Sequence, residues 1–154
     1  MCFRKCYGTG VKSMRPHDSP GDADEWLEFA EGDLRAASHA DWSELRIEIV
    51  CFHAQQAAEK ALKAVIVARG HTPAFTHNIQ RLMDTLDDIG VSTPAALREA
   101  DTLTVFAVAT RYPGAPIKPN ALDHMEALTL ARNVVSWARG VVQSLGSDVP
   151  GNQG

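Results

Sequence analysis

The amino-acid sequence predicts an all-α protein, an antiparallel up-and-down four-helix bundle with one additional short helix. Prolines, which interrupt helices, are absent between Pro20 and Pro73 and otherwise gather in short joints. In the long segments between them, apolar residues recur every three or four positions, which is the period of an amphipathic helix. No segment shows the alternation of apolar and polar residues that is typical of a strand. Amphipathic helices with short joins pack most simply as an antiparallel bundle.

The first two helices are predicted from Asp24 to Ala40 and from Ser43 to Arg69. Acidic residues at the beginning of the first helix suit its positively polarised end. The second helix has the clearest apolar stripe in the sequence, formed by Ile47, Val50, Cys51, Ala54, Ala58, Ala61, Leu62 and Val65. Gly70 follows at the position of a C-terminal cap, so the second helix is expected to end there.

Three further helices are predicted after Gly70. The third runs from Ile79 to Ile89 and is ended by Gly90. The fourth runs from Leu97 to Ala107, and the last and longest from Asn120 to Leu145. The apolar positions that define the fourth helix are Leu97, Ala100, Leu103, Phe106 and Ala107.

Length and charge limit the domain organisation and the class of function. The chain has 154 residues, which suits one domain. Residues 1–22 lack helical period and are expected to form a flexible extension, residues 23–146 the helical domain, and residues 147–154 a flexible tail. The net charge of -4 means that any nucleotide or RNA site must be a local basic patch. No apolar run reaches the length of a membrane span or of a signal peptide, which predicts a cytoplasmic protein without membrane contact.

The three cysteines do not predict a metal site. Cys2 and Cys6 have no histidine or second cysteine pair nearby to complete a tetrahedral zinc site. Cys51 falls on the apolar stripe of the second helix and is expected to be a small core residue. We therefore expect neither a metal ion nor another cofactor.

A polar flank on the second helix is the first candidate site. Arg46, His53 and Lys60 are seven residues apart, so each lies only about 20° from the last around the helix axis. Gln56 and Lys63 lie beside them. The flank is either a solvated surface supported by pairs such as Glu59 with Lys63, or a site for an anion such as phosphate. His77, just before the third helix, could bond a loop carbonyl or act on a substrate.

The turn at residues 110–114 is the second candidate. In it, Arg111 precedes Tyr112 and Pro113. An arginine beside an aromatic ring in a rigid turn can pair with a phosphate while the ring stacks on a base. The same two side chains could instead fix the loop onto the bundle.

These segments resemble the HEPN domain, a helical module often encoded beside a minimal nucleotidyltransferase. The resemblance rests on the string from His53 to Ala64, on Thr76-His77 before an apolar helix, and on the turn from Thr110 to Pro113, and covers roughly residues 24–145. It implies an antiparallel four-helix bundle with an extra short helix, usually homodimeric. It also implies one of two functions, ribonuclease activity or binding to a partner protein.

Many HEPN proteins are metal-independent ribonucleases with an arginine and a histidine, separated by four to six intervening residues, near the beginning of the last helix. The histidine can move a proton and the arginine can stabilise phosphate charge. Here the corresponding pair is Lys118 and His124, and lysine lacks the planar fork of arginine. Arg46 and His53 have similar spacing but lie on the second helix. The nuclease motif is therefore incomplete at the position where the family carries it.

The sequence thus favours a partner protein: a HEPN module that binds nucleotide or RNA phosphate and acts with a minimal nucleotidyltransferase, in a pair of the toxin–antitoxin type. Its expected binding residues are Lys60, Lys63, His77, Arg111 and Tyr112. The alternatives are a metal-independent endoribonuclease toxin, with the two pairs above as candidate catalytic residues, and a purely structural assembly module. A homodimer is expected because aromatic side chains lie off the apolar stripes, namely Phe29, Trp42 and Phe52.

Overall fold

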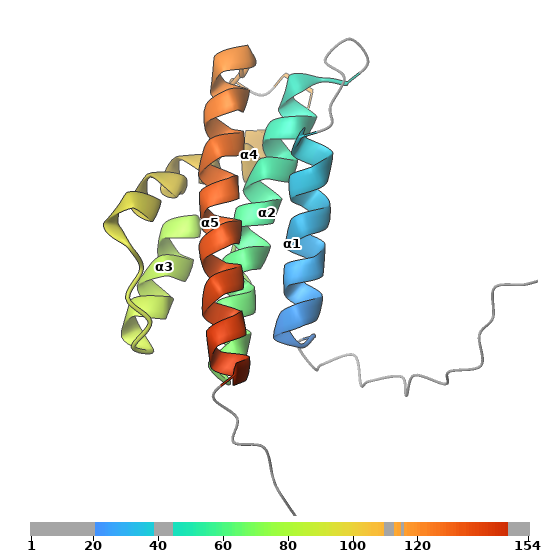
Figure 1. Ribbon diagram of the computed structural model, residues 1–154. Coiled ribbons are helices and arrows are strands. Elements are labelled where there is room, and N and C mark those ends of the chain that lie inside the picture. Colours follow the sequence, from blue (N-terminus) through green and yellow to red (C-terminus); the bar gives the residue numbers. More distant parts are fainter. Residues whose placement is uncertain (1–20, 39–44, 110–112, 115, 148–154) are drawn as a thin grey trace, which may run out of the picture.

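The protein is a bundle of helices (Figure 1). The computed structural model describes residues 21–38, 45–109, 113–114 and 116–147. In chain order the elements are α1 (Ala23–Ser38), α2 (Ile47–Ala68), α3 (Ile79–Asp88), the 3-10 helix η1 (Ala95–Val105), α4 (Phe106–Ala109) and α5 (Ala121–Ser147). No strand occurs in these described ranges, and the predicted all-helical fold class is confirmed.

The predicted helix limits agree closely with the structure wherever both are described. The predicted starts of α1, α3 and α5 each fall within one residue of the observed start. Residues 39 and 40, where the first helix was predicted to end, and residues 43 and 44, where the second was predicted to begin, lie outside the described part. The same holds for residues 1–20 of the predicted extension and residues 148–154 of the predicted tail.

Two glycines end helices as predicted. Gly70 has φ of 80° and Gly90 has φ of 83°, a backbone region that favours glycine. After α2, His71 N donates to Ile66 O at 3.1 Å and Gly70 N donates to Val67 O at 2.8 Å. Val91 N and Gly90 N make the equivalent bonds after α3. Both ends are therefore Schellman motifs, in which the left-handed glycine lets the chain satisfy the last carbonyls and turn away.

The predicted fourth helix takes a different form. Its segment is an eleven-residue 3-10 helix followed by the single turn of α4. The physical reason lies in the spacing of its buried side chains, which recur at every third position and so share one face at three residues per turn. These side chains are Leu97, Ala100, Leu103 and Phe106. The side chain of Arg98 holds η1 to α3 through Asp84 and Asp87.

Helix α2 is the centre of the bundle. It packs against α1, α3, α4, α5 and η1. Alanine side chains, all fully buried, occupy much of its surface and let neighbouring helices approach closely. They are Ala54, Ala57, Ala58, Ala61 and Ala64. Cys51 is also fully buried on α2 as predicted, and burial raises the pKa of its thiol to about 11.

The relative directions of the three long helices could not be predicted from the spacing of apolar residues. Helix α1 runs antiparallel to both α2 and α5, whereas α2 and α5 run in the same direction (Figure 1). The chain returns between them through α3, η1 and α4. The beginning of α1 and the end of α5 consequently lie at the same end of the bundle.

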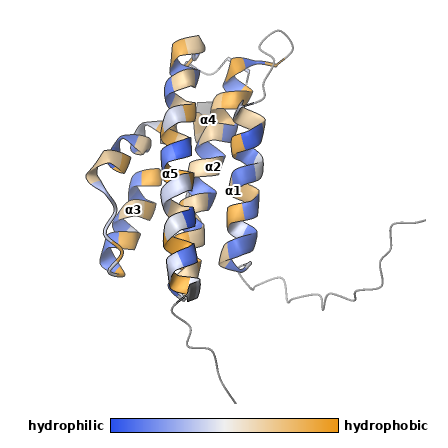
Figure 2. Ribbon diagram, viewed as in Figure 1, coloured by the Kyte–Doolittle hydropathy of each residue, from blue (hydrophilic) through white to orange (hydrophobic). Residues whose placement is uncertain are grey.

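Hydrophobic and hydrophilic residues alternate around α1 and α5, as expected for helices with one buried face (Figure 2). Some large apolar side chains nevertheless face solvent. Phe29 on α1 is 61% exposed and Phe75, between α2 and α3, is fully exposed. Others are exposed near the beginnings of α2 and α5, namely Leu45, Ile49, Leu122 and Met125. None of the described helices is both long enough and apolar enough to cross a membrane.

Leu62 provides a test of this core. Its side chain is fully buried in the second half of α2. Replacing it by alanine should lower the free energy of unfolding by about 3 kcal/mol, through lost apolar burial and the cavity that remains. Urea unfolding followed by circular dichroism measures the change. The control Leu122→Ala removes a side chain that is 71% exposed and should change stability by less than about 0.5 kcal/mol. Equal effects of the two substitutions would contradict the packing described.

Candidate functional site

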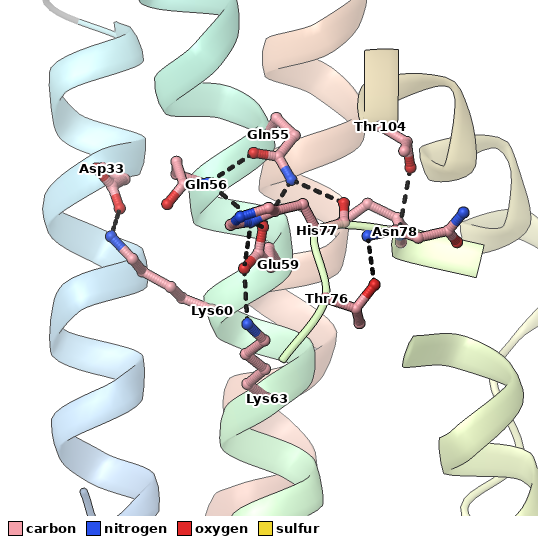
Figure 3. Close-up of polar contacts among 11 residues, drawn as sticks. Asp33, Gln55, Gln56, Glu59, Lys60, Lys63, Thr76, His77, Asn78 and Thr104 are labelled. Carbon is pink, nitrogen blue, oxygen red and sulfur yellow. Dashed lines mark hydrogen bonds and ion pairs between the residues drawn. The ribbon is translucent and has the colours of Figure 1, made fainter. Parts of the chain in front are cut away.

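Polar side chains gather along one side of α2 in two groups (Figure 3). The Glu59 cluster consists of Gln55, Gln56, Glu59, Lys63 and His77. The Asp33 cluster consists of Asp33, His53 and Lys60. Together these eight residues are called the polar face below.

Glu59 is the hub of the first cluster. Its carboxylate accepts hydrogen bonds from Lys63 Nζ at 2.7 Å and from Gln55 Nε2 at 2.8 Å. Gln56 Nε2 lies 3.3 Å away and His77 Nδ1 3.1 Å away. The side chain of Glu59 is only 4% exposed, so these partners replace the water that burial removes.

The same contacts set the ionisation of Glu59. Burial alone would raise the pKa of its carboxyl, but the hydrogen bonds from Lys63 and Gln55 outweigh burial and hold the pKa below its usual value. Lys63 is itself 9% exposed and donates to this carboxylate. The pair is therefore a buried ion pair that the neighbouring amides complete.

The Glu59 cluster also fixes the junction between α2 and α3. His77 is held at its ring by Glu59 and at its backbone carbonyl by Gln55 Nε2, 3.3 Å away. The next residue, Asn78, caps α3 by accepting from Arg81 N at 2.8 Å. Thr104 Oγ1, just before α4, accepts from Ile79 N at 3.0 Å (Figure 3). His77 is thus held in place, and its side chain remains 43% exposed.

In the Asp33 cluster one carboxylate of α1 binds two basic groups of α2. Asp33 Oδ2 lies 2.5 Å from Lys60 Nζ, and Asp33 Oδ1 lies 2.9 Å from His53 Nδ1. The side chains are partly open to solvent: Asp33 is 14%, Lys60 24% and His53 33% exposed. This cluster and His77 therefore form the accessible part of the polar face.

Aromatic rings border both clusters. Lys60 Nζ lies 5.8 Å from the centre of the Phe29 ring, and Lys63 Nζ lies 5.7 Å from that of Trp26. These distances suit cation–π contacts, which limit the freedom of both lysines. The Phe75 ring lies 6.4 Å from the His77 ring. A fully exposed aromatic ring thus stands beside a partly exposed imidazole.

The structure brings four of the sequence candidates together, Lys60, Lys63, His53 and His77. The predicted Glu59–Lys63 pair forms, and Lys60 is paired with Asp33. The two lysines and the two carboxylates of the polar face balance in charge. Any anion that binds there must therefore compete with a carboxylate for its basic partners.

The remaining candidates lie elsewhere. Arg46, 78% exposed, donates to Glu48 Oε1 at 2.9 Å. Lys118 is exposed in the segment before α5, whereas His124 is 3% exposed and its Nε2 lies 2.9 Å from Ala37 O on α1. The surroundings of these two residues thus differ sharply. Arg111, Tyr112 and Trp42 lie outside the described residues.

Sequence reasoning did not single out Asp33, Gln55 or Glu59 as site residues. Gln55 carried a usable signal, because it lies between Cys51 and Ala58 on the apolar stripe and yet is polar. A polar residue at a core position needs a partner, which here is Glu59. Asp33 carried no such signal, because its partners are 20 and 27 residues away along the chain.

The fold and the polar face define a helical bundle whose central helix carries a buried glutamate–lysine pair. The sequence profile of the HEPN domain matches residues 23–141, and the chain belongs to this family. The crystal structure of TT1696 from Thermus thermophilus is similar, with 36% identity, a TM-score of 0.67, and coverage of 77% of this chain and 97% of that one. The crystal structure of ST0689, an archaeal HEPN homologue, has 27% identity, a TM-score of 0.64, and coverage of 80% and 99%. No curated protein sequence gives a significant match.

The lowered pKa of Glu59 predicts an acid-sensitive contribution to stability. Because the pKa in the folded state is below the usual 4.5, the contribution is complete above about pH 5 and is lost as the pH falls through the folded-state pKa. Glu59→Gln should remove this part of the pH dependence. It should also lower stability at pH 7 by about 3 kcal/mol, because Lys63 keeps a buried charge without its carboxylate.

Urea unfolding between pH 7 and pH 3.5 measures both effects. Glu126→Gln, which neutralises an exposed carboxylate on α5, is the control and should follow the native protein. If the Glu59→Gln variant lost stability with acid as steeply as the native protein, the assignment to Glu59 would be wrong.

Proposed function

We propose that this HEPN domain binds the phosphate of a nucleotide or of RNA on its polar face. The observation that supports the proposal is the grouping of partly exposed Lys60, His53 and His77 on one side of the bundle. Basic groups suit phosphate, and the exposed ring of Phe75 beside His77 offers a surface on which a base can stack. Lys63 would stabilise the polar face from the core side through its bond to Glu59. The predicted phosphate-binding role of Arg111 and Tyr112 falls on residues outside the described part of the chain.

We further propose that the domain acts in the cytoplasm with a minimal nucleotidyltransferase as its partner, in a pair of the toxin–antitoxin type. Membership of the HEPN family supports this partner, because the resemblance to HEPN modules implies a domain that is often encoded beside such an enzyme.

The endoribonuclease alternative finds less support in the geometry. Its first pair requires His124 to reach a substrate, but this ring is buried and bonded to α1. Its second pair requires Arg46, whose guanidinium is directed to Glu48. A binding function therefore explains the described side chains better than either catalytic pair. For a purely structural assembly module, association with the partner protein would not depend on the residues of the polar face.

Lys60→Ala should weaken the binding of a fluorescein-labelled twelve-nucleotide oligouridylate by about fivefold. The variant loses one cation and leaves Asp33 to repel phosphate. Fluorescence anisotropy at 50 mM salt measures the affinity, and a denaturing gel of the same samples should show intact RNA. ATP as a second probe tells a mononucleotide site from an RNA site.

Arg139→Ala is the matched control, because Arg139 also pairs with a carboxylate of α1, Glu31, but lies on α5. It should leave affinity nearly unchanged. If neither the oligouridylate nor ATP bound to the native protein, the binding proposal would be wrong. RNA cleavage that His124→Ala abolishes would favour the endoribonuclease instead.

The exposed ring of Phe29 supports the predicted homodimer. Phe52 is partly buried, and Phe29 is 61% exposed on the neighbouring helix. Light scattering at micromolar concentration should give twice the 16.7 kDa mass of one chain. Phe29→Asp should shift the mass toward one chain, whereas Leu122→Asp, at the beginning of α5, should not. A monomer before any substitution would refute the dimer.

A further inference from the structure

Both carboxylate oxygens of Asp33 are bonded to basic groups of the proposed site. One oxygen binds Lys60 Nζ and the other binds the His53 ring. Lys60 and His53 are seven residues apart, about two helical turns, so the single Asp33 side chain of α1 bridges two turns of α2. Phosphate oxygens would seek the same two groups.

The two carboxylates of the polar face differ in access. Glu59 and Lys63 are almost completely buried, and Glu59 has further partners in Gln55, Gln56 and His77. Asp33 is 14% exposed, and its two basic partners are 24% and 33% exposed. Separating Asp33 from Lys60 and His53 therefore exposes groups that already contact solvent. Separating Glu59 from Lys63 would instead expose buried charges of the core.

We propose that Asp33 is an internal competitor for the anion, a carboxylate that a bound phosphate must displace from Lys60 and His53. This inference rests on the proposed function of the polar face. The Lys60 ammonium is also held near the Phe29 ring, so it keeps its place when the carboxylate is displaced. The phosphate thus replaces the Asp33 carboxylate as the partner of a Lys60 ammonium that is already in position.

Competition by Asp33 has a consequence for the class of ligand. Displacement subtracts the same free energy from the binding of every anion, so an anion with few other contacts binds too weakly to be retained. The exposed ring of Phe75, 6.4 Å from the His77 ring, would give a phosphate attached to a base a further contact by stacking. Asp33 therefore restricts the site to nucleotides and RNA and excludes inorganic phosphate.

Asp33→Asn is the informative substitution, because it removes the negative charge and keeps the size and hydrogen-bonding ability of the side chain. The labelled oligouridylate should bind about tenfold more tightly to this variant, which lacks both the ion pair and the repulsion of phosphate. Inorganic phosphate should compete with the oligonucleotide in the variant at millimolar concentration, but not in the native protein. Circular dichroism confirms that the variant is folded.

Glu31→Gln is the matched control. Glu31 is also a carboxylate of α1 bound to a cation of another helix, Arg139. It is two residues from Asp33 and therefore about 200° away around the helix. The Glu31→Gln substitution changes the net charge by the same amount as Asp33→Asn and should leave the affinity for the oligouridylate within about twofold of the native value. Asp33→Glu retains the charge and should not tighten binding.

A measurement on the native protein tests the same exchange without a substitution. The ring nitrogens of His53, observed by nitrogen-15 NMR, should shift as the oligouridylate saturates the protein, because His53 Nδ1 changes its partner from Asp33 to phosphate. Unchanged His53 signals at saturation, or equal affinity of Asp33→Asn and the native protein, would overturn the role of Asp33 and leave the binding function standing. Absence of binding in the native protein and in every variant would remove the binding function and the competition with it.

Discussion

The placement of α3 against α2 depends on the buried carboxylate of Glu59. A charge so deeply buried is tolerated only when donors surround it, and here the donors come from α2 itself and from the segment before α3. His77 is one of them, so the requirement of Glu59 for partners fixes where α3 begins. From there the cap at Asn78 and the bond between Ile79 and Thr104 position α3 against the end of η1. One polar residue of the core thus orders three elements.

The helices were predictable from sequence because helix formation is local. Apolar side chains three and four residues apart define a buried face, and the glycines at 70 and 90 supply the left-handed residue that ends a helix. The 3-10 helix was missed although its signal was present: Leu97, Ala100, Leu103 and Phe106 keep a strict three-residue spacing, which was assigned to an α-helix. The shared direction of α2 and α5 had no local signal, because it depends on the path of the chain through α3 and η1.

The candidate site divides in the same way. Lys60, Lys63 and His53 were predicted to share one side of a helix, since that needs only the helical period. Their carboxylate partners are less accessible to such reasoning. Glu59 reaches Lys63 within one helix, whereas Asp33 reaches His53 and Lys60 only because α1 packs antiparallel to α2. An apparently cationic flank therefore became a balanced surface once the helices were assembled.

The opposite directions of α1 and α5 also bring Ala23, at the beginning of α1, to the same end of the bundle as Ser147, at the end of α5 (Figure 1). Neighbouring ends make a fold suitable for circular permutation, because a short linker can join them without crossing the core. New termini could then be opened at the turn after α3, beside the exposed Gly90. The bundle could in this way be inserted as a cassette within another protein.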